Sequence, residues 1–324
     1  MKIFSEYKNT SKNLLIKEST EPQYTLCPKD KKELGQMIEE EIAKQGYEAD
    51  LNHIDVSWIT DFSSVFENSK FNGDISKWDV SSAISMHRMF INASEFDGDI
   101  SDWDVSNVTD MSRMFWGCES FDQDLSGWDV SNVTDMGSMF HRASKFKGDI
   151  STWDVRNVTN MKDMFYECKQ FNGNLKRWNT KNVENMIGMF CSSKFNQDIS
   201  KWNVSNVKYM SSMFQGSNFN QDISEWDVSN VIFMNFMFNK NSGFNQDLSR
   251  WDVSKVTSMD SMFEDAKSFN QDISNWNVSN VNDMDYMFEG AKLFNQDLSD
   301  WDVSEVKGSK NIFDNCPCPK EYQP

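Results

Sequence analysis

A tryptophan recurs at a nearly constant interval through most of this chain of 324 residues. Consecutive members of the series are separated by 25 residues, or by 24 at two steps: Trp78, Trp103, Trp128, Trp153, Trp178, Trp202, Trp226, Trp251, Trp276 and Trp301. The residues around each one are nearly the same, as in "FNQDLSRWDV" at 244–253 and "FNQDISNWNV" at 269–278. A period of this length is typical of stacked repeats, in which each repeat forms one coil and buries its apolar side chains only against its neighbours.

Each repeat joins two different hydrophobic patterns. In residues 125–130, "LSGWDV", the apolar residues follow the L-x-x-L-x-L pattern of the strand in leucine-rich repeats. Met136, Met139 and Phe140 then occupy positions i, i+3 and i+4, which lie on one face of a helical turn. The sequence therefore predicts a repeat solenoid of the α/β class, a leucine-rich-repeat-like right-handed solenoid with one parallel β-sheet and short helical turns on the opposite side.

The repeats divide the chain into four predicted segments: a loosely ordered N-terminal extension at 1–27, an amphipathic capping helix at 28–48, a solenoid of eleven coils at 49–316 and a C-terminal tail at 317–324. Asp30 and Glu33 form a capping box at the start of the predicted helix, and Gly46 is its natural stop. In the first coil Ile54 stands where the other ten have tryptophan. We expect the tryptophans to point into the core as an aromatic ladder.

The charge of the chain restricts the partners it can have. Its net charge is −18, with 50 acidic and 32 basic residues, so its surface repels the phosphates of nucleic acids and attracts cationic partners. No run of 18 apolar residues occurs, so no membrane insertion is expected. The start of the chain also lacks an apolar stretch of signal-peptide length, which by sequence alone favours a cytoplasmic location.

No pattern in the sequence points to an enzyme. His53, His87 and His141 fall in different columns of the repeat and share no motif. A glycine-rich phosphate loop, an H-E-x-x-H motif and a nucleophile elbow are all missing from the sequence. We therefore expect no catalytic residues, no cofactor and no metal site, in a chain that is a monomer or associates weakly with itself.

Two columns of acidic residues accompany the tryptophans. One lies four residues before each tryptophan and the other directly after it, as Asp124 and Asp129 do in one repeat. Stacked carboxylates repel one another, and two arrangements would offset the repulsion. Either calcium binds along the column through carboxylate oxygens, or each side chain accepts a backbone N–H in an Asx-turn. Asn179, Asn203 and Asn277 in the second column keep the acceptor oxygen without the charge, which favours the Asx-turn.

The repeat unit F-N-Q-D-[IL]-S-x-W-[DN]-V-S-N-V-x-x-M-x-x-M-F resembles the BspA-like leucine-rich repeat proteins, in particular a domain of unknown function in bacterial surface proteins and mycoplasma lipoproteins. The resemblance covers residues 49–316. It implies a leucine-rich-repeat solenoid for protein–protein contact, in some members an adhesin that binds host matrix, located at the cell surface or secreted. The chain departs from this family in showing neither a signal peptide nor a lipobox cysteine near its start.

One place in the repeats breaks the polar pattern. Seven residues after the tryptophan the residue is small or polar in nine of eleven coils, but Tyr209 and Phe233 fill this position in adjacent coils. Ile232 stands where other coils have threonine, and Phe236 lies one helical step from Phe233. We interpret Tyr209, Ile232, Phe233 and Phe236 as an exposed apolar patch that binds a partner. The alternative is local repacking, forced by two nearby loops, at 191–194 and 215–218, that are each one residue shorter than in other coils.

The function that these observations favour is a non-catalytic scaffold for protein–protein interaction, which the resemblance would extend to adhesion or host interaction. Two alternatives stay open. One is a calcium-binding structural solenoid. The other is an acidic cytosolic inhibitor or immunity-type protein that captures a basic partner. The identity of a protein partner does not follow from the sequence, although a cationic one would suit the acidic chain.

Overall fold

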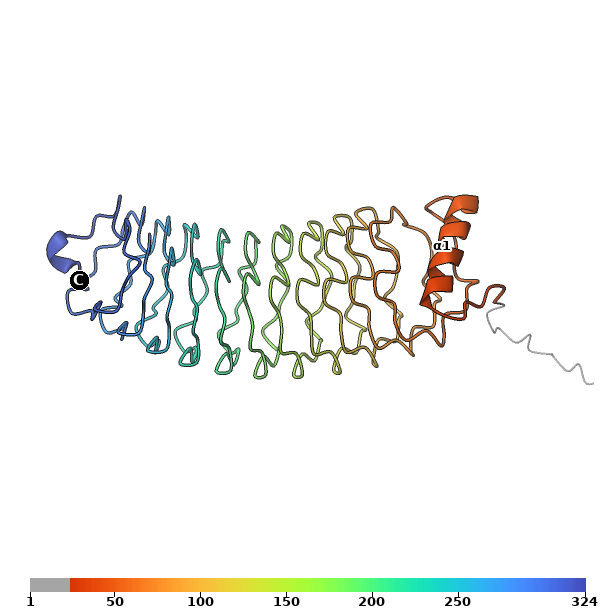
Figure 1. Cartoon of the computed structure of the whole chain (residues 1–324), viewed down its shortest axis with the longest axis horizontal. Helices are drawn as coiled ribbons and strands as arrows, with labels where there is room; N and C mark the ends of the chain where they lie inside the picture. The colour runs from red at the N-terminus through yellow and green to blue at the C-terminus, as the bar shows by residue number, and fades with distance from the viewer. Residues whose placement is uncertain (1–23) are drawn as a thin grey trace, which may run out of the picture.

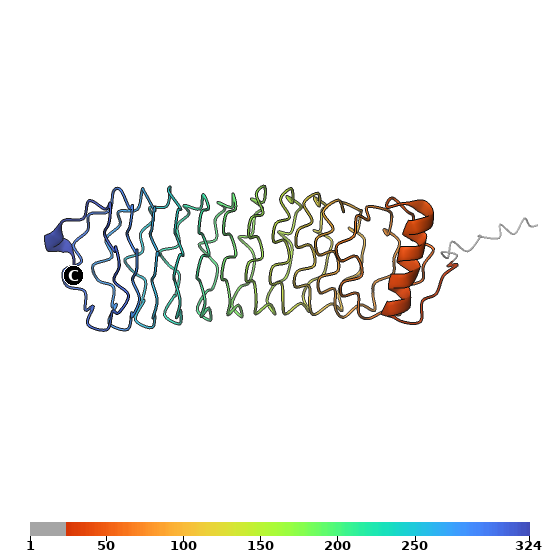
Figure 2. The same ribbon diagram turned by 45° about the horizontal axis from the view of Figure 1, so that its top comes forward.

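The computed structural model describes residues 24–324, which form one long stack of coils with the helix α1 across its N-terminal end (Figure 1). The described residues contain α1, Lys31–Gln45, and a short 3-10 helix η1, Lys320–Tyr322, at the opposite end. After a turn of 45° the coils still follow one another in sequence order along one axis (Figure 2). Residues 1–23, most of the predicted extension, lie outside the described part of the chain. We number the coils 1 to 11 by Ile54 and the ten tryptophans.

The helix α1 begins and ends at the residues that the sequence suggests. The Asp30 side chain accepts a hydrogen bond of 2.8 Å from the Glu33 backbone N–H, which caps the first turn. Gly46, with φ of 88°, ends the helix in the left-handed region that glycine tolerates. Leu34 and Ile38 are buried against the first coil. The helix thereby covers apolar side chains at the end of the stack.

The predicted parallel β-sheet is absent from residues 24–324. Among these residues the β pairing between neighbouring coils is limited to isolated parallel bridges, and the main series runs from Asp61↔Ser85 to Asp283↔Gly308. These bridges lie seven residues after the tryptophan, outside the L-x-x-L-x-L segment. The methionine-containing segment is not helical either, and forms consecutive turns. The prediction of a leucine-rich-repeat-like α/β solenoid with one sheet and helical turns opposite it is therefore wrong.

Local hydrogen bonds explain why no sheet forms around the tryptophans. In coil 4, Asp124 Oδ1 accepts from the Ser126 N–H at 2.9 Å and Asp129 Oδ1 accepts from the Ser131 N–H at 3.0 Å. The Trp128 N–H donates within its own coil to the carbonyl of Leu125 at 3.1 Å. Such side-chain and turn hydrogen bonds compete with a sheet ladder for the same backbone groups. The Asx-turns thus take the N–H groups that a strand would use.

The eight residues that begin seven positions after the tryptophan, here called the Met segment, join the coils in a different way. In coil 3, residues 110–117, the N–H groups of Met111, Arg113, Phe115 and Gly117 all donate to carbonyls of coil 4 at 2.7–3.1 Å. Arg113 and Gly117 have φ of 58° and 72°. A parallel β-strand directs its N–H and C=O groups to both sides, whereas here every inter-coil N–H of the segment faces the following coil.

The core is a set of stacked aromatic columns, as predicted for the tryptophans. Trp78 and Trp103 stack with ring centroids 6.5 Å apart and an interplanar angle of 5°, and each is 3% exposed. The Trp103 Nε1–H donates to the Ile75 carbonyl of the preceding coil at 3.1 Å. Columns of buried phenylalanine and methionine complete the interior. The expectation of a buried tryptophan ladder is confirmed.

Serine accounts for the coils that are one residue short. Ser193 Oγ donates to the Phe190 carbonyl at 2.8 Å and accepts from the Phe195 N–H at 3.3 Å. Ser217 makes the same pair of hydrogen bonds in the next coil. In longer coils this position holds a smaller or different residue, such as Ala143, whose carbonyl closes the turn instead. Each shortened loop is therefore closed by hydrogen bonds of a serine within its own coil.

Candidate interaction surface

The outward side chains of the Met segments form one continuous surface along the stack. In coil 3 these are the side chains at Asp110, Ser112, Arg113, Trp116 and Gly117, while the methionines and phenylalanine between them are buried. The equivalent five positions of every coil are called the Met face below. Because the inter-coil hydrogen bonds fix the backbone here, the face differs from coil to coil only through its side chains.

The structure places Tyr209 and Phe233 side by side on the Met face. Their backbones form a parallel bridge, and their rings stack with centroids 6.0 Å apart and an interplanar angle of 15°. Phe233 is 39% exposed, and Tyr209 is half-buried. The bridge series passes through both residues to Asn185 on one side and Ser258 on the other without a change of register.

The other two residues of the predicted patch lie in the same coil as Phe233. Ile232 is half-buried, and its N–H donates to the Lys208 carbonyl at 2.9 Å. Phe236 is also half-buried, and it has φ of 60° in a column where every coil is left-handed. Its N–H donates to the Asp260 carbonyl of coil 9 at 2.8 Å. All four side chains therefore sit on coils 7 and 8 at or beside the Met face.

A second aromatic column on the Met face escaped the sequence prediction. Trp116 stacks on His141 with centroids 4.1 Å apart, and His141 stacks on Tyr166 at 4.5 Å. The Arg113 guanidinium lies 5.5 Å from the centroid of the Trp116 ring, in cation–π geometry. Alignment of the residues that follow each buried phenylalanine would have revealed this column, because the three residues occupy the same position of coils 3, 4 and 5.

His141 is held in its neutral form. Burial, followed by the nearby charge of Arg142, lowers the pKa of His141 to about 4. The side chain is 8% exposed, and its Nδ1 has no hydrogen-bond partner among the described residues. At neutral pH the centre of this column is thus an uncharged, buried aromatic ring.

Charge is distributed unevenly along the Met face. Coils 2 to 8 carry cations and carboxylates in similar number: Arg88, Arg113, Arg142, Lys162 and Lys240 against Asp110, Asp135, Asp163 and Glu167. Coils 9 and 10 carry carboxylates and no lysine or arginine at these positions: Asp260, Glu264, Asp265, Asp283, Asp285 and Glu289. Burial, and then the charges of Asp283 and Asp285, raise the pKa of Asp260. The carboxylates on coils 9 and 10 therefore repel one another.

The aspartates beside the tryptophans act as Asx-turn acceptors in the structure. Asp149 Oδ1, for example, accepts from the Ser151 N–H at 2.9 Å, and Asn174 does the same for the Lys176 N–H at 3.0 Å. These hydrogen bonds lower the pKa of Asp149, Asp272 and others in the column. Within residues 24–324 no group of three or more histidine, cysteine or acidic side chains is arranged to hold a metal ion.

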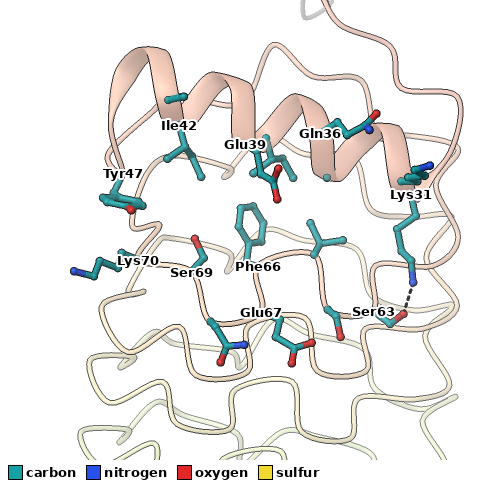
Figure 3. Close-up of a pocket in the computed structure, with 17 residues that line it drawn as sticks. Lys31, Gln36, Glu39, Ile42, Tyr47, Ser63, Phe66, Glu67, Ser69 and Lys70 are labelled. Carbon is teal, nitrogen blue, oxygen red and sulfur yellow. Dashed lines mark hydrogen bonds between the residues drawn. The ribbon is translucent and has the colours of Figure 1, made fainter.

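A cavity of about 1040 Å³ lies between α1 and coil 1 (Figure 3). Lys31 spans one side of it, donating from Nζ to Ser63 Oγ and to Asp61 Oδ2, each at 2.7 Å. Ile42 and Phe66 line it together with Glu39 and Glu67, so apolar and charged groups alternate around the space. Neither the repeat pattern nor the apolar face of the helix predicts a cavity at this place.

Comparison with solved structures and with curated proteins does not identify the fold or the activity of this chain. A likeness to the protein in "Crystal structure of TLR13-ssRNA13 complex" has 9% identity and a TM-score of 0.26, covering 82% of this chain. The chain spans 48% of that protein, about half its length, and a likeness this low indicates neither fold nor activity. A search of curated proteins finds no match. No helix among residues 24–324 is long and apolar enough to cross a membrane.

The family comparison covers all of the repeats. The model described as "Mycoplasma protein of unknown function, DUF285" matches three successive stretches, residues 33–151, 138–235 and 215–322. These stretches together contain α1 from Glu33 onward and all eleven coils. This match does not confirm the resemblance of the repeat unit to the BspA-like leucine-rich repeat proteins. The chain belongs to the DUF285 family of mycoplasma proteins of unknown function.

Proposed function

We propose that the chain is a non-catalytic scaffold that binds another protein chain through the Met face, with Tyr209, Ile232, Phe233 and Phe236 as the apolar anchor. The observation that carries the proposal is the exposed ring of Phe233 stacked on Tyr209. Partly exposed aromatic side chains that lie together on a protein surface are favoured anchors of protein interfaces. Neither the Tyr209 ring nor the Phe233 ring is part of the buried aromatic columns inside the coils.

The alternative of local repacking has less support. The short loops of coils 6 and 7 are closed by Ser193 and Ser217 on their own. The bridge series runs through Tyr209 and Phe233 with the same register as in longer coils. If the short loops had forced a rearrangement, a disturbed register would be expected in these coils. The two rings are thus better explained as surface residues that bind a partner.

Affinity capture with three forms of the protein tests the proposal. Wild type, Tyr209→Ser/Phe233→Asp and Leu293→Ser are immobilised at equal density and exposed to extract of the source cells. Leu293 is 58% exposed but lies off the Met face, so Leu293→Ser removes an exposed apolar side chain without touching the patch. We expect bound protein to be retained by Leu293→Ser and lost by the double variant, while all three forms melt alike. Identical capture by all three forms would overturn the proposal.

A further inference from the structure

Coil 1 has a row of backbone carbonyl groups without hydrogen-bond donors, beneath α1. In coil 2 the carbonyls at the equivalent four positions each accept an N–H from coil 1, at 2.8–3.1 Å. The same positions of coil 1 are Asp61, Ser63, Val65 and Glu67, and none of their carbonyls accepts a hydrogen bond within residues 24–324. The first coil therefore presents four free acceptors, which in every later coil bind the N–H groups of the preceding one.

These carbonyls belong to the wall of the cavity beneath α1. Ser63, Val65 and Glu67 line the cavity from coil 1, and Phe66 points from the same coil toward the helix (Figure 3). The helix cannot supply the missing donors, because its own backbone N–H groups bond within the helix. The volume of about 1040 Å³ lies at the upper end of the range for ligand sites, about 300 to 1,000 Å³. The helix α1 thus covers coil 1 without filling the place that a preceding coil would take.

Gly35 keeps the same space open from the side of the helix. It lies in the interior of α1 and lines the cavity, although glycine is a poor helix former. A Cβ at Gly35 would meet no atom within 4 Å, so packing among the described residues gives no reason for the absent side chain. Glycine at such a place allows another backbone to approach closely. The missing side chain therefore leaves room for a chain between α1 and the free carbonyls.

The unpaired charges of the lining favour an acidic occupant. Lys32 and Lys70 are exposed and form no ion pair among residues 24–324. The Glu67 carboxylate is bound by the Arg88 guanidinium at 2.6 Å, which leaves Glu39 as the unpaired carboxylate of the lining. Two free cations against one free carboxylate distinguish this cavity from the rest of a chain whose net charge is −18. An acidic segment therefore meets attraction here and repulsion over most of the molecule.

We propose that this cavity binds an acidic, partly apolar segment of a partner protein, which enters beneath α1 and donates backbone N–H groups to the carbonyls of coil 1. Four donors at alternate residues require a segment of about seven residues. Main-chain hydrogen bonds to an exposed edge supply affinity in such complexes, and side-chain contacts supply selectivity. The site is separate from the apolar patch on coils 7 and 8 and does not depend on it.

The chain itself contains a segment with the required chemistry. Residues 283–290, "DMDYMFEG", combine three carboxylates with four large apolar side chains. Within the stack, the N–H groups of Met284, Tyr286, Phe288 and Gly290 donate to four carbonyls of coil 11 at 2.7–2.8 Å. A free peptide of this sequence can offer the same row of donors to coil 1, and its apolar side chains can pack against Phe66. It therefore serves as the probe for the cavity.

Fluorescence anisotropy of this labelled peptide with the full chain tests the proposal. We expect a dissociation constant of about 1 to 100 µM. N-methylation at Tyr286 and Phe288 of the peptide removes two donors and should raise the constant at least about tenfold. Equal affinity of the two peptides, or no binding at about 1 mM, overturns the proposal. Displacement of the labelled peptide by a synthetic peptide of residues 1–23 also overturns it, because the site would then belong to the N-terminal segment of this chain.

A matched pair of variants in α1 locates the binding site. Gly35→Leu places a side chain in the cavity and should weaken peptide binding at least about tenfold. Its melting temperature should equal or exceed that of wild type, because leucine is the better helix former. Glu40→Leu adds the same side chain at an exposed position of α1 outside the cavity and should bind like wild type. Unchanged binding by Gly35→Leu would show that the peptide binds elsewhere and would overturn the proposal.

A charge reversal tests the site without a change in α1. Lys70→Glu should weaken peptide binding about threefold to fivefold, whereas Lys145→Glu, on an exposed lysine of coil 4, should have no effect. Equal binding by these two variants would contradict the inferred role of charge at the cavity. The patch variant Tyr209→Ser/Phe233→Asp should bind the peptide like wild type, so this site and the Met-face patch are tested separately.

Discussion

The two sides of each coil differ in how freely their sequence changes. The side with the tryptophan repeats the same residues in nearly every coil, because each Asp or Asn closes a turn and each Trp Nε1–H bonds to the preceding coil. The Met face shares this regular backbone, but its outward residues range from glycine to tryptophan. The repeated side therefore stabilises the fold, and the Met face is the part of the stack whose side chains differ from coil to coil.

Replacement of Trp178 by alanine should give the largest loss of stability. Trp178 is 3% exposed, stacks on Trp153 and Trp202 at 6.3 and 6.2 Å, and donates to the Ile150 carbonyl at 3.1 Å. We expect a cost of about 3 to 5 kcal/mol in the free energy of unfolding, as for other buried large aromatics. Guanidinium denaturation measures it.

The matched substitution on the other side of the coil is Phe233→Ala. Its ring is exposed, so we expect a change within about 0.5 kcal/mol in the free energy of unfolding. Similar losses for Trp178→Ala and Phe233→Ala would show that the two sides share the stabilising role.

Acid should destabilise the tryptophan side as a whole. Hydrogen bonds from the following serine lower the pKa of Asp149, Asp222 and Asp272 below the value of an unfolded chain. A carboxylate with a lowered folded-state pKa stabilises the fold above its unfolded pKa of about 3.9, and this stabilisation is lost as the pH falls through the folded value. Melting temperatures should therefore decline steeply below about pH 4. A melting temperature that is flat down to about pH 2 would contradict the role of these turns.

The acidic end of the Met face should respond with the opposite sign and a smaller effect. Burial, Asp283 and Asp285 raise the pKa of Asp260, so its ionised form opposes folding at neutral pH. Asp260→Asn should raise the melting temperature slightly at pH 7, and the gain should vanish as acid protonates Asp260 in the wild type. An equal gain at both pH values would assign it to something other than charge.

Parts of the site followed from the sequence because alignment of repeats predicts neighbours. Residues in the same column of adjacent coils must lie side by side, so the sequence alone places Tyr209 next to Phe233. The same rule applies to Trp116 and His141, whose column was overlooked. The cavity beneath α1 had no such signal, because it depends on how a helix outside the repeats packs onto coil 1.

The sequence by itself determined the period, the number of coils, the buried tryptophan column and the residues that share a column, since a strict repeat allows each position only one environment. Only the tertiary structure decided how the coils are joined. An L-x-x-W-x-V segment is compatible with a strand, but Asp149 and its equivalents take the N–H groups that a strand would need. The Met segment is compatible with a helix, but its N–H groups find carbonyls in the next coil. Which partner a backbone group takes depends on stacking geometry, which the pattern of apolar residues does not contain.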